Sequence, residues 1–322
     1  MIKDVKISLA LQILTFTIVF HGVRLYNSEV FEINIKQEVV DRRIHMSILE
    51  AIIQGVVQGL TEFLPVSSSG HIALVQHFTN VEAESTGLIM ALLHLGTLVA
   101  VFIAFYDTIW ALIKEAFKML GELFTLKFTL KDMNDYRKMI IMLIVATLPL
   151  LVFYPFKSVY DALLEKGGMV LLGFCFLYTS TLLFVADRKD NGHKTIKDMK
   201  YGNALTIGIF QCIALLPGVS RSGSTIGSSL FLGFSKDLAV KFSFILGIPA
   251  ILGGCLVEFK DAFEGSVTIE VVPMMIGFIV AAVVGYLSIK MINWLIKTDK
   301  YRIFAYYTLV LGLATIGIGI FG

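Results

Sequence analysis

Long apolar runs recur along this chain at a spacing that is typical of membrane-spanning helices. Six of them carry few charges and approach the roughly 20 residues that a helix needs to cross the hydrocarbon core. They lie near residues 88–106, 139–156, 168–186, 239–258, 271–290 and 301–321. The pattern predicts an all-α polytopic membrane protein with six full transmembrane helices.

Two further apolar regions, 46–78 and 203–234, are interrupted in the middle by proline, glycine and serine. The interruptions run from Pro65 to Gly70 and from Pro217 to Gly223. Helices rarely continue through such clusters. We therefore expect each region to form two short helices joined by a polar elbow. Such a region either crosses the membrane with a kink or folds back as a re-entrant hairpin.

Composition supports a membrane protein and narrows its partners. The 322 residues are 56% hydrophobic and 16% charged, with a mean hydropathy of +0.79. Soluble domains carry roughly 25% charged residues. The net charge of +2 is too small to indicate a nucleic-acid partner. The three cysteines lie scattered in apolar stretches, so we expect core residues and neither a disulfide framework nor a metal site.

The lysine and arginine pattern decides between kinked and re-entrant regions, because cytoplasmic loops carry the excess of these residues. Basic residues dominate 107–138, 187–202 and 290–302, whereas 258–270 is acidic. If the basic loops are cytoplasmic and the acidic loop is external, then 203–234 must return to the side of the membrane from which it entered. The charge pattern therefore predicts two re-entrant hairpins, the first entering from outside and the second from the cytoplasm.

The two broken regions are also related in sequence. A shift of 153 positions aligns Ala51 with Ala204, Gly55 with Gly208, Gln58 with Gln211, Ser67 with Ser220, Ser69 with Ser222 and Gly70 with Gly223. Each region is followed by three predicted spans, and the predicted entry faces are opposite. We therefore expect an inverted-topology repeat, with halves near 46–186 and 203–322, and a site at the repeat interface.

Two lone ionisable residues mark the candidate chemistry. Glu62 is the only acidic residue between 51 and 81, and Arg221 is the only charged residue between 201 and 235. Such groups in apolar segments are costly and usually face a partner or a cavity. They either pair to lock the hairpins together or face a shared polar pocket. The hydroxyls around Arg221 and the helix start behind them favour a pocket that binds phosphate.

The two elbows resemble the signatures of the undecaprenyl-diphosphate phosphatase family, also known as bacitracin-resistance proteins. The first signature has Glu or Gln, three residues, Glu, and then Pro-x-Ser-Ser-x-Gly-His. Gln58, Glu62 and residues 65–71 match it. The second, Pro-Gly-x-Ser-Arg-Ser-x-x-Thr, is matched by residues 217–225. The resemblance extends from Met46 to Gly322.

This resemblance implies a hydrolase acting on a phosphoric anhydride. It would convert undecaprenyl diphosphate to the monophosphate, recycle the lipid carrier for cell-wall synthesis and confer bacitracin resistance. The implied catalytic residues are Glu62, Ser68, His71 and Arg221. The implied diphosphate-binding residues are Ser67, Ser69, Ser220, Arg221, Ser222 and Thr225. Glu62 and Gln58 would bind a divalent cation, Mg²⁺ or Ca²⁺.

The nucleophile stays open between Ser68, with His71 beside it as base or acid, and a metal-bound water. His94, which lies in an apolar span, is expected to be a core histidine. The resemblance also implies a bacterial plasma membrane location with the site facing outside. The expected partner is the lipid diphosphate, and a homo-oligomer stays open.

The first 45 residues form an extension ahead of the predicted catalytic unit, 46–322. Residues 7–23 are apolar and follow Lys3 and Lys6. This segment is an anchor helix, an uncleaved signal, or sequence upstream of a misassigned start.

Two rival functions share some of these sequence features. A transporter of a prenyl phosphate lipid would share the inverted repeat, although transport needs no Ser-His-Glu-Arg cluster. The second lipid-phosphatase class requires a histidine five residues beyond the arginine, where this chain has Gly227. That rival fails on sequence.

Overall fold

The computed structural model describes residues 46–79, 86–129, 131, 133–188, 192–264, 271–297 and 301–321. The N-terminal extension, 1–45, lies outside the described residues, so its predicted anchor or signal segment stays a prediction. Every regular element among the described residues is helical, apart from one isolated bridge between Lys194 and Phe234. The predicted all-α class is confirmed.

The predicted spans correspond to six long apolar helices. They are α5 (Thr86–Ala104), α7 (Asp135–Phe153), α8 (Lys157–Asp187), α11 (Lys236–Glu264), α12 (Val271–Lys297) and α13 (Arg302–Phe321). Each contains a stretch long and apolar enough to cross a membrane. In α8 this stretch is Lys166–Asp187, and a kink at Gly168, whose φ is 51°, lies near its start. The prediction of six membrane-spanning helices is confirmed by length and composition.

Both broken regions form two short helices separated by an elbow, as predicted. The first consists of α3 (Ile48–Phe63) and α4 (Ser68–Thr79), and the second of α9 (Tyr201–Ile213) and α10 (Arg221–Phe231). The first elbow contains Ser67 at a φ of 73°, a left-handed conformation that costs a non-glycine residue about 1–2 kcal/mol. The surrounding fold must supply that energy, which is a common arrangement at functional sites.

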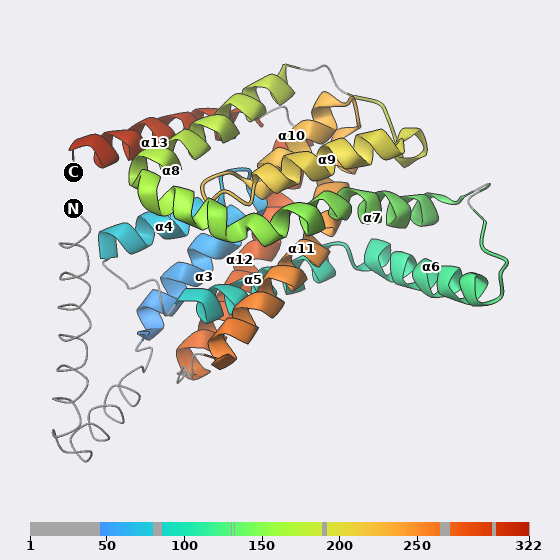
Figure 1. Ribbon diagram of the computed structural model, residues 1–322, viewed down its shortest axis with the longest axis horizontal. Coiled ribbons are helices and arrows are strands. Elements are labelled where there is room, and N and C mark those ends of the chain that lie inside the picture. Colours follow the sequence, from blue (N-terminus) through green and yellow to red (C-terminus); the bar gives the residue numbers. More distant parts are fainter. Residues whose placement is uncertain are drawn as a thin grey trace, which may run out of the picture. The chain divides into compact units, whose positions relative to one another are not determined.

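Glycine lets the helices of the two halves approach closely. Helix α12 packs along α3 and α5, α9 lies beside α7, and α8 runs beside α13 (Figure 1). A Cβ on Gly59 of α3 would collide with the α12 backbone at Ala281 and Gly285. The pairs α3–α12 and α9–α7 each join the first helix of a broken region to the second span of the other half. The re-entrant course and the inverted orientation stay predictions.

One helix was not predicted. The sequence of 107–138 was interpreted as a basic loop, but the structure contains α6 (Tyr106–Phe124), which packs against α7. Its apolar residues cover about half of the helix circumference, and its charged residues share the other half. Arg137 of α7 holds α6 in place with hydrogen bonds of 2.8 Å to Glu115 and 2.9 Å to Glu122.

Candidate active site

A polar pocket of about 330 Å³ lies where the two elbows meet. Its walls come from both broken regions and from α5, α7 and α11. The polar and charged side chains that line it are those of Thr61, Glu62, Ser67, Ser68, Ser69, His94, Gln211, Ser220, Arg221 and Glu258. The structure therefore brings together chemistry from opposite halves of the chain, as the sequence analysis predicted.

The lone carboxylate and the lone guanidinium contact each other in this pocket. Arg221 donates from Nη2 to Oε1 of Glu62 at 2.5 Å, and the two side chains are 17% and 6% exposed. Ser68 and Gln58 donate to the other carboxylate oxygen, Oε2, at 2.8 and 3.1 Å. The pairing and the shared pocket, posed as alternatives from the sequence, are therefore both present.

Two helices begin at the pocket wall. Helix α4 starts at Ser68 and α10 at Arg221, and the residues at both starts line the pocket. Ser220 caps α10, since its Oγ accepts from the N–H of Gly223 at 3.0 Å. Helix N-termini carry partial positive charge and unpaired N–H groups, so they attract anions. Two such ends beside a guanidinium form a site suited to a phosphate group.

The predicted phosphate-binding residues divide into two groups. Ser67, Ser69 and Ser220 line the pocket, whereas Ser222 and Thr225 do not. Ser222 donates to the carbonyl oxygen of Leu64 at 3.0 Å, and this bond joins the two elbows. Thr225 is fully buried, and its hydroxyl lies 2.5 Å from that of Ser243. In this structure the Ser222 hydroxyl joins the two elbows and the Thr225 hydroxyl contacts α11, so phosphate binding by these two residues stays a prediction.

Both ring nitrogens of His71 contact groups other than Ser68, the residue that His71 was predicted to assist. Its Nδ1 lies 2.7 Å from the carbonyl oxygen of Ser67, and its Nε2 lies 2.7 Å from the hydroxyl of Tyr307. Ser68 instead directs its hydroxyl to Glu62. The geometry favours Glu62 over His71 as the proton acceptor for Ser68.

Two pocket residues were missed as functional candidates. His94, expected to be a core histidine, has its Nε2 3.7 Å from Oε2 of Glu62, while its Nδ1 donates to the carbonyl of Met90 at 2.8 Å. Gln211 is 2% exposed, and neither polar atom of its amide has a hydrogen-bond partner among the described residues. The alignment of Gln211 with Gln58 was visible in the sequence, but its direction into the pocket required the tertiary structure.

The implied divalent cation would have few protein ligands in this pocket. The described residues contain no group of three or more His, Cys, Asp or Glu side chains that could hold a metal. Glu62 lies at the pocket, and Oε1 of Gln58 is buried without a hydrogen-bond partner among the described residues. Mg²⁺ commonly binds through one or two carboxylates together with substrate phosphates. The residues therefore fit a cation held jointly with a phosphate ligand.

Fold and site together define a polytopic membrane protein with a polar pocket between two broken helical regions. Residues 51–314 match the family model of the bacitracin resistance protein BacA. This chain therefore belongs to the bacitracin resistance protein family.

Curated relatives match most of the chain. The undecaprenyl-diphosphatase of Alkaliphilus metalliredigens is 41% identical over 269 residues, which cover 83% of this chain and 97% of the relative. The undecaprenyl-diphosphatase of Methanobrevibacter smithii is 38% identical over 271 residues, covering 83% and 96%. Undecaprenyl-diphosphatase 4 of Bacillus thuringiensis subsp. konkukian is 36% identical over 271 residues, with the same coverage.

Proposed function

We propose that this chain hydrolyses undecaprenyl diphosphate to undecaprenyl phosphate and inorganic phosphate. Such an activity recycles the lipid carrier of cell-wall polymers and confers bacitracin resistance. The observation that carries the proposal is the meeting of Glu62, Ser68 and Arg221 at two helix N-termini in one pocket. The relatives that bear the name undecaprenyl-diphosphatase support the same reaction.

Diphosphate binding is assigned to Arg221, Gln211 and the two helix starts. A guanidinium forms forked bonds with phosphate oxygens. The unpaired amide of Gln211 supplies a further donor in the same pocket. When Arg221 turns to the phosphate, Oε1 of Glu62 loses its partner. The carboxylate then becomes a better proton acceptor.

The reacting step is assigned to Ser68 and Glu62. The Oγ of Ser68 attacks the terminal phosphorus, and its proton passes to Oε2 of Glu62 across the existing 2.8 Å hydrogen bond. The bond between the terminal phosphorus and the bridging oxygen breaks, and undecaprenyl phosphate leaves. Water then cleaves the phosphoserine to release inorganic phosphate. His94, beside the same carboxylate oxygen, orients it and stabilises its charge.

A divalent cation, Mg²⁺ or Ca²⁺, would be held by Glu62 and Gln58 together with the diphosphate, and it would neutralise phosphate charge. Direct attack by water is the alternative to Ser68. Trapping a phosphorylated enzyme with labelled substrate in wild type, and losing it in Ser68→Ala, would support serine attack. Full turnover by Ser68→Ala would support water.

We further propose that the protein lies in the bacterial plasma membrane with this pocket facing outside. A homo-oligomer is compatible with the proposal and is not required by it. The rival function, movement of a prenyl phosphate lipid across the membrane, is not favoured, because the pocket contains a hydroxyl in contact with a carboxylate.

The experiment uses the purified full chain in liposomes that contain undecaprenyl diphosphate. Phosphate release and the lipid product are measured with added cation and with chelator. Stoichiometric undecaprenyl phosphate and inorganic phosphate, dependent on the cation, would support the proposal. Movement of labelled lipid between leaflets without phosphate release would contradict it and favour the transporter.

A further inference from the structure

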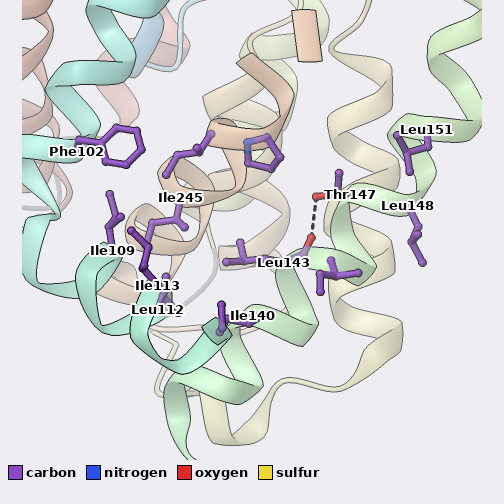
Figure 2. A pocket seen from close by; sticks show the side chains of 14 residues that line it. Phe102, Ile109, Leu112, Ile113, Ile140, Leu143, Thr147, Leu148, Leu151 and Ile245 are labelled. Carbon is purple, nitrogen blue, oxygen red and sulfur yellow. Dashed lines mark hydrogen bonds between the residues drawn. The ribbon is translucent and has the colours of Figure 1, made fainter. Parts of the chain in front are cut away.

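A second cavity, which is almost wholly apolar, lies between α6, α7, α11 and the end of α5 (Figure 2). Its volume is about 450 Å³, and we call it the apolar groove. Phe102 and Ile109 lie on one side of it, and Leu148 and Leu151 lie on the other. Of the 14 residues that line it, only Thr147 carries a polar side-chain atom, and its hydroxyl donates to the carbonyl of Leu143 at 2.8 Å. The groove therefore offers a ligand no free polar side chain.

The apolar groove adjoins the polar pocket along two helices. On α7, Leu150 lines the pocket and Leu151 lines the groove. On α11, Ala250 lines the pocket and Pro249 lines the groove. Consecutive residues are about 3.8 Å apart at Cα. A molecule with a charged head in the pocket and an apolar tail can therefore occupy both cavities by passing between α7 and α11.

We propose that the apolar groove binds the prenyl chain of the diphosphate substrate. The inference rests on the proposed function, because the pocket must hold a diphosphate that carries such a chain. The length of an extended undecaprenyl chain exceeds half the thickness of the hydrocarbon core, and that half is about 15 Å. A chain anchored in the pocket must continue past that depth, and the groove runs along α7 in the direction away from the pocket.

The prenyl chain of the substrate differs from the chains of other lipids because its diphosphate head is held in the polar pocket beside the groove. Membrane lipid is as apolar as the groove, so the hydrophobic effect contributes little to binding there. Contacts within the groove give only modest attraction. A chain whose head is already bound has a high effective concentration beside the groove, which a free lipid lacks. The bound head therefore selects the prenyl chain as the occupant.

The test compares hydrolysis of undecaprenyl diphosphate with hydrolysis of farnesyl diphosphate, whose chain is much shorter. Leu148→Trp fills the groove from a position that is 49% exposed. Val283→Trp on α12, 56% exposed and outside the groove, is the matched control. We expect Leu148→Trp to lower the ratio of kcat/KM for the long to the short substrate by about three- to tenfold, since packing within lipid contributes modestly. Val283→Trp should leave the ratio at the wild-type value.

An equal loss for both substrates, or the same change in the control, would overturn the proposal and leave the phosphatase assignment intact. A second measurement does not depend on turnover. An undecaprenyl diphosphate analogue with a diazirine at the far end of its chain should label peptides of α6 or α7, and Leu148→Trp should reduce that labelling. Labelling confined to other helices would contradict the groove. A wild type that is labelled in the groove but releases no phosphate would refute the proposed function alone.

Discussion

The Glu62 carboxylate has polar neighbours on both oxygens, as a buried charge requires. Arg221 occupies Oε1, while Gln58, Ser68 and the more distant His94 surround Oε2. The same set of groups can hold a phosphate and accept a proton, so we interpret the arrangement as catalytic.

Gln211→Leu tests whether the unpaired amide is reserved for a ligand. A hydrogen bond to a charged phosphate contributes roughly 1.5–3 kcal/mol, so we expect kcat/KM to fall about 10- to 100-fold. Thermal stability should rise or stay the same, because the variant removes a buried amide that lacks partners among the described residues. A joint loss of stability and activity would indicate a structural role and contradict the assignment.

Gly247→Ala tests whether the position of the Arg221 guanidinium matters, and it leaves the arginine side chain itself chemically unchanged. A Cβ on Gly247 of α11 would overlap the guanidinium of Arg221, whereas nothing lies within 4 Å of a Cβ on Gly253 of the same helix. Both changes raise helix propensity by roughly 1 kcal/mol. We expect Gly247→Ala to lower kcat/KM at least about tenfold, because the added Cβ displaces the guanidinium from the place where it can reach a phosphate in the pocket.

Gly253→Ala is the matched control for that experiment and should keep wild-type kinetics. Equal activity of the two variants would contradict the assignment of the Arg221 guanidinium, in its observed position, to diphosphate binding.

At the scale of elements, the sequence predicted the helices that are marked by residues within the helix itself or directly beside it. Runs of apolar residues marked the six spans, and Pro65 and Pro217 marked the elbows to within a few residues. Helix α6 was missed because the basic residues of 107–138 were interpreted as the charge of a cytoplasmic loop and the helical period of its apolar residues was not weighed. It is stabilised by tertiary contacts with α7, which no local pattern displays.

Arg137→Gln tests how α6 is attached. Arg137 is 7% exposed and pairs with Glu115 and Glu122. We expect the variant to lose about 2 kcal/mol of stability, between the values for surface and fully buried pairs. The control is Arg302→Gln, which breaks a more exposed pair with Asp187 and should lower stability less. Equal melting temperatures for the two variants would contradict this role.

The attachment of α6 should also depend on pH. The Arg137 guanidinium holds the pKa of the Glu122 carboxyl below its usual range. A lowered folded-state pKa stabilises the protein above the ordinary value, about 4.3, and the contribution is lost as the pH falls through the lower value. Acidification below about pH 4 should therefore destabilise wild type more than Arg137→Gln, as thermal unfolding at several pH values would show.

At the scale of the whole molecule, the sequence predicted which segments meet but not how each side chain points. The distribution of charged residues and the 153-position repeat predicted that Glu62 and Arg221 share one pocket. The structure confirms that both line it. The motifs alone placed Ser222 and Thr225 in the cradle and His71 beside Ser68. Side-chain direction at an elbow depends on neighbouring helices, and those neighbours supplied Ser243 to Thr225 and Tyr307 to His71.

Single-cysteine labelling tests the predicted topology. With the native cysteines replaced, Lys197→Cys should be protected from an impermeant maleimide in intact cells, and Val271→Cys should react. The reason is that a re-entrant 203–234 leaves these two positions on opposite sides. Protection of both in intact cells, with labelling after lysis, would mean that 203–234 crosses the membrane.

The central claim is that Glu62 and Arg221, from opposite halves of the chain, form one phosphatase site. The most direct measurement is phosphate release from undecaprenyl diphosphate by wild type, Glu62→Gln and Arg221→Ala, each shown to be folded by its melting temperature. The account predicts release by the wild type and a fall of at least about 100-fold in both variants, as for loss of a preorganised charged group. Release that persists near the wild-type rate in both folded variants would contradict it.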